Sequence, residues 1–175
     1  MDDAAWDPSV DEGDSSFDVI AMLPSMWHVR NKERTKETVR EIQRRLVPHR
    51  RRVEDVRADP VAFDALLDDF AWSWAIARST DSPTLREAAY AALLHALPPC
   101  DVDPRMRRHF FRRLIAFDER HIALLDELSA GGARNVGGAD DSMRLVREDL
   151  GRAGFLADGR LTPLGERFRR FITPS

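Results

Sequence analysis

The sequence contains one cysteine, Cys100, among its 175 residues. A single thiol cannot form an intramolecular disulfide or build a thiolate metal site by itself, and this usage is typical of a reducing compartment. No apolar run approaches the roughly 20 residues that a membrane-spanning helix needs. The start of the chain, Met1-Asp2-Asp3, has no basic stretch before an apolar one. We therefore expect a cytoplasmic protein that has no contact with a membrane.

Patterns that carry catalysis or metal binding are also lacking. The densest group of glycines reads GGARNVGG, with no Lys-Ser/Thr after it and no strand before it, so it is not a phosphate-binding loop. The histidines do not fall at spacings that would join three or four metal ligands. His121 lies three residues after Asp118 but on an apolar stripe, which is typical of a buried histidine. We expect no catalytic residue, no metal and no cofactor, and therefore no enzyme.

Charge is distributed unevenly along a chain whose formal net charge is −3. Residues 1–29 carry seven acids and no lysine or arginine, whereas residues 30–57 carry eleven bases and five acids. The acidic, aperiodic start predicts a disordered tail over residues 1–16. A chain of this length can bury one main core. We place that core in a helical bundle over residues 17–117.

The clearest helical pattern lies in residues 33–57. Apolar positions recur there at intervals of three and four residues, which is a heptad seam. A polar residue in such a seam, here His49, more often specifies register or partner than catalysis. Pro48 predicts a kink in one continuous helix, because the apolar phase continues past it. The seam is a candidate interaction surface and consists of Val39, Ile42, Leu46, His49, Val53 and Val56.

Three later helices begin with the same pair, a capping residue followed by proline. These pairs are Asp59-Pro60, Ser82-Pro83 and Asp103-Pro104. The helix from Pro104 either runs on through Leu128 or breaks near Asp118, which can cap a separate helix, and the glycine-rich residues 129–138 predict a loop. The Asp158-Gly159 pair suits a two-residue hairpin turn within residues 155–161. Thr162-Pro163 then predicts the start of a last helix.

The string LVREDLGRAGFLADGRLTPLGERFRRFI resembles the end of winged-helix domains of the MarR and PadR kind. In these domains a recognition helix leads to a two-stranded wing, whose second strand ends in Leu-Thr-Pro-x-Gly. The whole chain resembles, more loosely, bacterial helical proteins in which a bundle precedes such a module. The resemblance implies a winged-helix-like module over residues 118–175, with the 129–138 loop in place of the second helix. The expected fold is all-α: a helical bundle and this module, which contains one short β-hairpin.

Two functions follow from these observations. The first is a non-enzymatic helical interaction or regulatory protein that self-associates or binds a protein partner, with a degenerate winged-helix module. The alternative is a winged-helix DNA-binding transcriptional regulator. Acids interrupt the arginines of the 142–153 helix, and DNA affinity rests largely on phosphate neutralisation, so the first function is favoured. Candidate contacts to nucleic acid or an anionic partner are Arg44, Arg45, Arg50, Arg51, Arg52, Arg144, Arg147, Arg152 and Arg160.

Overall fold

The computed structural model describes residues 32–131 and 141–174. This part of the chain is mostly helical and contains one small two-stranded antiparallel sheet, which confirms the expected helical fold with a hairpin. The tail predicted over residues 1–16, the bundle's first segment 17–31 and most of the 129–138 loop lie outside the described residues. Ser129, placed in that loop from sequence, is instead the last residue of a helix.

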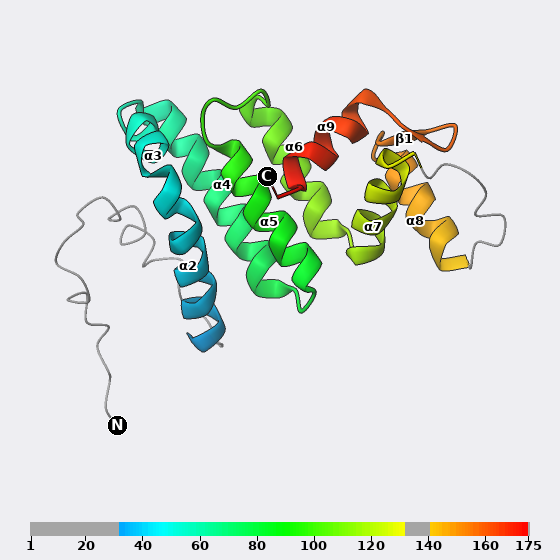
Figure 1. The fold of residues 1–175 in the computed structure, drawn as a ribbon, viewed down its shortest axis with the longest axis horizontal. Coiled ribbons are helices and arrows are strands. Elements are labelled where there is room, and N and C mark those ends of the chain that lie inside the picture. Colours follow the sequence, from blue (N-terminus) through cyan, green and yellow to red (C-terminus); the bar gives the residue numbers. More distant parts are fainter. Residues whose placement is uncertain (1–31, 132–140, 175) are drawn as a thin grey trace.

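The elements follow one another along the long axis of the molecule (Figure 1). In chain order they are α2 (Lys32–Leu46), the 3-10 turn η3 (Val47–His49), α3 (Arg50–Arg57), α4 (Pro60–Ser79), α5 (Pro83–Ala96), α6 (Pro104–Ala116), α7 (Glu119–Ser129), α8 (Asp141–Arg152), β1 (Leu156–Ala157), β2 (Arg160–Leu161) and α9 (Pro163–Ile172). Helices α2 and α3 form one end, and α7, α8 and the hairpin form the other. Helix α9 returns from the hairpin to the middle and packs on α5.

The helix starts predicted from sequence are confirmed, because the side chains of the predicted capping residues accept hydrogen bonds from the first turn. Asp59 accepts from the N–H groups of Val61 and Ala62 at the start of α4. Ser82 caps α5 and Asp103 caps α6 in the same way. Each of these helices has proline in its first turn, where no intrahelical hydrogen bond is lost.

The heptad seam is buried within the chain's own core. Ile42 is 1% exposed, and Val39, Leu46 and Val56 are also buried, while His49 and Val53 are half-buried. Helices α2 and α3 present this seam to α4, and α2 also contacts α5. The turn η3 at Pro48 is the predicted kink. A second chain could not use this seam without displacing α4, so the role of interaction surface expected for it is corrected to a core contact.

Small side chains allow α4 and α5 to approach closely at the centre of the bundle. Ala89 and Ala92 of α5 are fully buried, as is Ser73 of α4. The Ser73 hydroxyl donates a hydrogen bond of 2.7 Å to the Ala89 carbonyl oxygen, which removes the cost of burying that hydroxyl. The alanine-rich α5 therefore serves as the helix on which α4 and α9 both pack.

A cluster of aromatic rings joins the bundle to the C-terminal elements. Phe155, which precedes the hairpin, stacks on Phe168 of α9 with ring centroids 4.4 Å apart. Phe110 of α6 contacts both rings edge-on, at 6.2 and 5.2 Å. All three side chains are fully buried. The hydrophobic core therefore continues without a break from α6 into the hairpin and α9.

An ion pair is buried between α4 and α6. Arg107 Nε donates to Asp69 Oδ2 at 2.7 Å, and the two side chains are only 10% and 5% exposed. Arg107 Nη1 also donates to the Val102 carbonyl oxygen at 3.1 Å. Burial raises the pKa of Asp69 to about 6, although the Arg107 guanidinium opposes this rise. The neighbouring pair Arg108–Asp68 joins the same two helices on the surface.

We predict that Arg107→Met lowers the free energy of unfolding by about 3–5 kcal/mol at pH 7, because it leaves the Asp69 carboxylate buried and unpaired. The loss should shrink as pH falls through the wild-type pKa of Asp69 and level off below it, since the carboxyl is then protonated in both proteins. Arg108→Met, which breaks the exposed pair, should cost at most about 1 kcal/mol. Urea denaturation of both variants measures the difference, and equal losses would contradict the prediction.

Candidate interaction surface at α8 and the hairpin

Residues with positive φ position the hairpin, one just before its first strand and two in its turn. Gly154 (φ 77°) ends α8 in the left-handed conformation that glycine adopts without strain. Asp158 (φ 50°) and Gly159 (φ 71°) form the predicted two-residue turn, and both angles fit a type I′ turn. The strands pair with Leu156 opposite Leu161. The hairpin predicted from Asp158-Gly159 is therefore confirmed.

The Leu-Thr-Pro-x-Gly motif fixes α9 against the end of α8. Thr162 Oγ1 donates to the Gly154 carbonyl oxygen at 2.7 Å and accepts from the Gly165 N–H at 3.0 Å. The Thr162 N–H donates to the Phe155 carbonyl oxygen. The backbone of α9 passes so close to Phe155 that a Cβ at position 165 would lie 2.2 Å from that carbonyl oxygen. Only glycine fits at position 165.

We predict that Gly165→Ala destabilises the protein by about 2 kcal/mol or more, because the added methyl meets backbone that must shift. Gly151→Ala is the matched control. Position 151 is helical, and an added Cβ there has no neighbour within 4 Å. The control should be neutral or stabilising by up to about 1 kcal/mol, the helix preference for alanine. Thermal unfolding of the two variants tests this, and a stable Gly165→Ala protein would refute the close approach.

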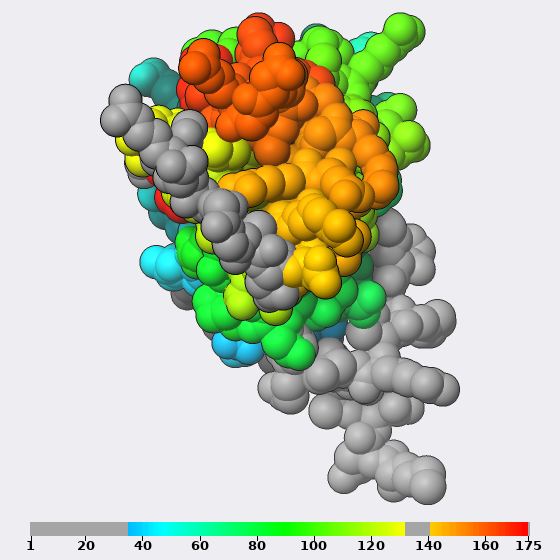
Figure 2. Space-filling view, turned by 90° about the vertical axis from the view of Figure 1, so that its right-hand side faces the viewer, coloured from blue at the N-terminus to red at the C-terminus, as the bar shows by residue number. Residues whose placement is uncertain are grey.

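Helix α8 lies beside the hairpin and covers much of this end of the molecule (Figure 2). Val146 and Leu150 of α8 are buried, which holds the helix on the core. Its opposite side is exposed and includes Leu145, 53% exposed. We call this side of α8 together with β1, β2 and their turn the α8–hairpin surface. The exposed residues of α8 are Asp141, Arg144, Leu145, Glu148, Asp149, Gly151 and Arg152.

Acids balance the arginines on this surface. Helix α8 contains three acidic and three basic residues. Arg144 lies 3.5 Å from Asp141, and Arg152 donates to Asp149 at 3.0 Å and to Glu148 at 3.2 Å. Half-buried Arg147 and exposed Arg160, near the hairpin turn, form no ion pair among the described residues. The helix that the resemblance places in the recognition position is therefore electrically neutral.

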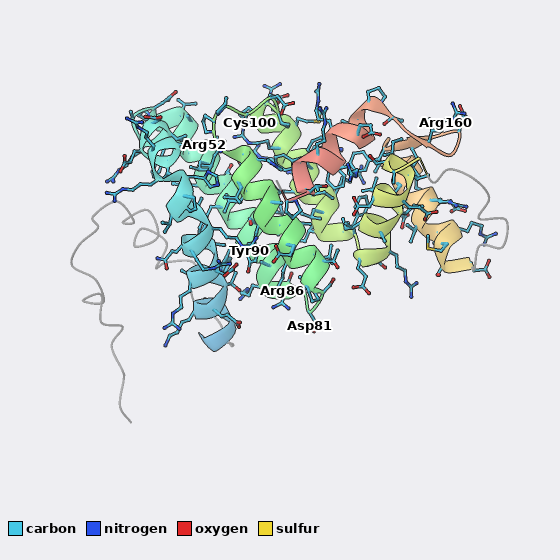
Figure 3. All side chains as sticks on the ribbon, in the orientation of Figure 1. Arg52, Asp81, Arg86, Tyr90, Cys100 and Arg160 are labelled. Carbon is cyan, nitrogen blue, oxygen red and sulfur yellow. The ribbon has the colours of Figure 1, made fainter. Side chains whose placement is uncertain are left out.

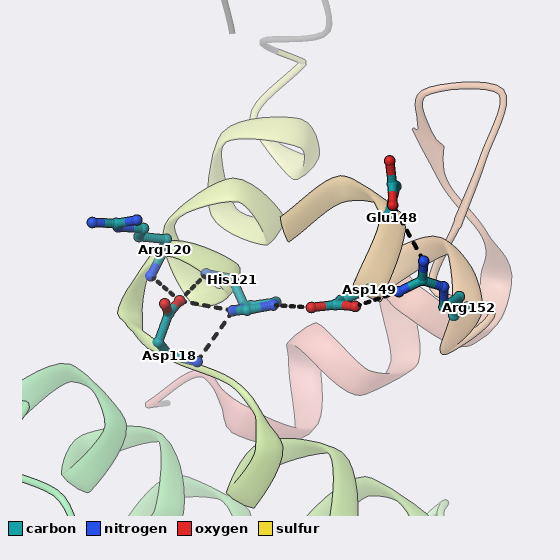
Figure 4. A network of polar contacts seen from close by, with 6 residues as sticks. All are labelled: Asp118, Arg120, His121, Glu148, Asp149 and Arg152. Carbon is teal, nitrogen blue, oxygen red and sulfur yellow. Dashed lines mark hydrogen bonds and ion pairs between the residues drawn. The ribbon is translucent and has the colours of Figure 1, made fainter. Parts of the chain in front are cut away.

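A buried histidine connects α7 to α8 (Figure 4). The His121 side chain is 8% exposed and stacks on the Phe117 ring at 4.5 Å. Its Nδ1 lies 2.7 Å from Asp118 Oδ1 and 3.1 Å from the Asp118 backbone nitrogen. Its Nε2 lies 3.8 Å from Asp149 Oδ2 and forms no hydrogen bond with a described residue. The burial predicted for His121 from its apolar stripe is confirmed.

The protonation state of His121 decides which of these contacts attract. A neutral ring without hydrogen on Nδ1 accepts from the Asp118 N–H, and one with that hydrogen donates to the Asp118 carboxylate. Only the doubly protonated ring donates toward both Asp118 and Asp149. Asp149 also accepts from Arg152, so the same carboxylate links the histidine to the exposed side of α8. This network belongs to the docking of α8.

Asp118 anchors the network by capping α7. Its Oδ1 accepts from the backbone N–H groups of Arg120 and His121, at 3.0 and 3.3 Å. Partial burial acts to raise the pKa of Asp118, but the hydrogen bonds from the His121 side chain and from these N–H groups hold it below its ordinary value. The ionised carboxylate therefore stabilises the folded state.

We predict that Asp118→Ala costs about 0.5–2 kcal/mol of stability at pH 7, the range for loss of a helix cap. Because the folded pKa is depressed, the wild-type advantage is complete above the unfolded value of about 4 and disappears as pH falls through the folded pKa. Asp118→Asn keeps a capping oxygen without a titrating group, so its difference from Ala should not fade in this way. Unfolding curves of the three proteins are compared from about pH 2 to pH 7, a range that includes the folded and unfolded pKa values of Asp118.

The second group of predicted contact residues lies at the other end of the molecule and is largely neutralised. Arg44 and Arg45 both donate to Glu41 at 2.6 Å, and Arg45 reaches Glu87 of α5 at 2.7 Å. The hydrogen bond from Arg44 is the main cause that lowers the pKa of Glu41 to about 2. Arg45 also lies over the Tyr90 ring, 4.6 Å from its centroid. These contacts fasten α2 to α5.

Two of the remaining arginines in this group bind other residues of the chain, and one has no ion pair among the described residues. Arg52 donates to the carbonyl oxygens of Leu97 and Pro98, the two residues that follow α5. Arg50 pairs with Glu54 at 2.9 Å. Arg51 is exposed and has no ion pair within the described part of the chain. The sequence analysis missed the capping role of Arg52, because its carbonyl partners lie 45 residues and more away and leave no local signal.

The two groups of arginines do not form one surface. Arg52 and Arg160 lie at opposite ends of the long axis (Figure 3). Helices α4, α5 and α6 separate α3 from α8 (Figure 1). The two groups are therefore separate candidate contacts.

In residues 32–131 and 141–174, no group of three or more His, Cys, Asp or Glu side chains is placed to hold a metal ion. Within the same residues no helix has the length and apolar character needed to cross a bilayer. The chain matches no protein-family model, and no curated protein or solved structure shows significant similarity to it.

Proposed function

We propose that this chain is a non-enzymatic helical protein that acts by binding other protein chains, with the α8–hairpin surface as its contact face. The observation that carries the proposal is the charge balance of α8, where ion pairs occupy Arg144 and Arg152 and an exposed leucine, Leu145, lies among them. An apolar centre with a polar rim is common at protein interfaces. Phosphate binding requires an excess of unpaired bases instead.

Within this proposal the C-terminal segment is a degenerate winged-helix-like module. The order of a helix, a two-residue-turn hairpin and a final helix capped by Thr162 supports this assignment. The runner-up, a DNA-binding regulator, is favoured at this surface by Arg147 and Arg160, which have no ion pair among the described residues. Affinity for duplex DNA rests on the neutralisation of several phosphates, and this surface offers two arginines without an ion pair.

Site-specific photo-crosslinking tests the contact face. A photoreactive residue at Leu145 should crosslink to protein in a cell extract. The same residue at Ile115, a similarly exposed position on α6 at 49%, is the control and should crosslink much less. Equal labelling from the two positions would overturn the choice of surface.

DNA binding is measured separately by fluorescence anisotropy with random and selected duplexes at several salt concentrations. We expect only non-specific binding, with a Kd of about 10⁻⁴–10⁻⁶ M near physiological salt. Submicromolar binding to one sequence that is lost in Arg147→Ala but kept in Arg51→Ala would establish the runner-up instead.

A further inference from the structure

We propose that the partner of the α8–hairpin surface is a second copy of this chain, and that the two copies pair through α8 in antiparallel orientation. The inference rests on the proposed function, since it names the occupant of the same surface. It comes from the order of charges along one exposed stripe of α8.

Four exposed residues form this stripe: Asp141, Leu145, Glu148 and Arg152. Their intervals of four, three and four residues place them on one side of the helix, the spacing by which two helices pack along their length. The buried residues Val146 and Leu150 lie on the other side. The stripe spans the twelve residues of α8, and its ends lie about 16 Å apart at the rise of an α-helix.

The stripe is self-complementary only in the antiparallel sense. Asp141 is the first residue of α8 and Arg152 the last. When two copies pair in antiparallel orientation around a two-fold axis, Asp141 of each copy lies opposite Arg152 of the other. The interface then has two ion pairs of the same kind. Parallel pairing would place Asp141 beside Asp141 and Arg152 beside Arg152. The antiparallel arrangement also aligns the helix dipoles favourably.

The middle of the stripe fits the same arrangement. Leu145 lies within one turn of its own symmetry mate, so the two exposed leucines cover each other next to the two-fold axis. Glu148 approaches Arg144 of the second copy, which adds a further opposite-sign contact. The existing pairs within one helix, such as Arg152–Glu148 at 3.2 Å, are exposed and contribute little, so they can rearrange into an intermolecular network.

A second copy fits this stripe better than a strongly charged partner. The stripe carries one acid at its start and one base at its end, so neither a polyanion nor a polycation gains along its whole length. Contact between two helices of this size buries an area at the low end of specific interfaces, below about 1,200 Å² in total. The expected dimer is therefore weak and depends on concentration.

Sedimentation equilibrium over a wide concentration range measures the dimer, with charge reversal as the test. Asp141→Arg alone and Arg152→Asp alone should each weaken dimerisation at least about tenfold. The double variant, Asp141→Arg with Arg152→Asp, restores both pairs and should dimerise again. An equal mixture of the two single variants should form heterodimers, because each copy then supplies the charge that the other needs. Arg51→Asp at the far end changes net charge as Arg152→Asp does and should have no effect.

Circular dichroism and thermal midpoints show whether each variant is folded, and Leu145→Ser gives a second route, since it removes exposed apolar area without touching a charge. It should also weaken the dimer. A wild-type protein that stays monomeric at all concentrations, or a double variant no better than the singles, would overturn the inference. Selective crosslinking from Leu145 to other proteins would then leave the proposed function standing, whereas loss of that selectivity would remove both.

Discussion

The stack of Phe155 on Phe168 is the contact on which the C-terminal half of this protein depends. It forms only because α9 approaches the Phe155 backbone closely enough to require glycine at position 165. Thr162 then caps α9 and fastens it to the end of α8. Phe110 of α6 closes the same cluster, and Val146 and Leu150 hold α8 on this core. The exposed side of α8 is thus presented in a fixed direction.

Several arginines have a structural role in the described part of this chain. Arg52 satisfies carbonyl groups at the end of α5, Arg45 bridges α2 to α5, and Arg107 joins α6 to α4 inside the core. A guanidinium group suits these positions because it presents several donors in a fixed plane. The basic run near Arg50 that is conspicuous in the sequence therefore does not produce an equally basic binding surface. Arg50 of this run pairs with Glu54, and Arg52 donates to backbone carbonyl groups.

Local chemistry made much of the fold predictable. Capping residues such as Asp59 and the Asp158-Gly159 turn act on backbone groups a few residues away, so their effect can be read from sequence. The heptad pattern around Leu46 indicated a buried seam. It did not indicate which element buries the seam, because the pattern is the same whether the seam packs against another chain or against α4. Partners distant in sequence left no signal at all. The Asp149 carboxylate near His121, and the carbonyl groups bound by Arg52, are examples.

The exclusion between the two functions is geometric. In a winged-helix DNA complex the recognition helix must lie with its exposed side in the major groove. In the proposed dimer the same side of α8 faces a second copy, so Leu145 and Glu148 are covered when the copies associate. The stripe of α8 cannot serve both contacts at once. The balance of acidic and basic residues on α8 thus favours a neutral partner surface and disfavours a polyanion.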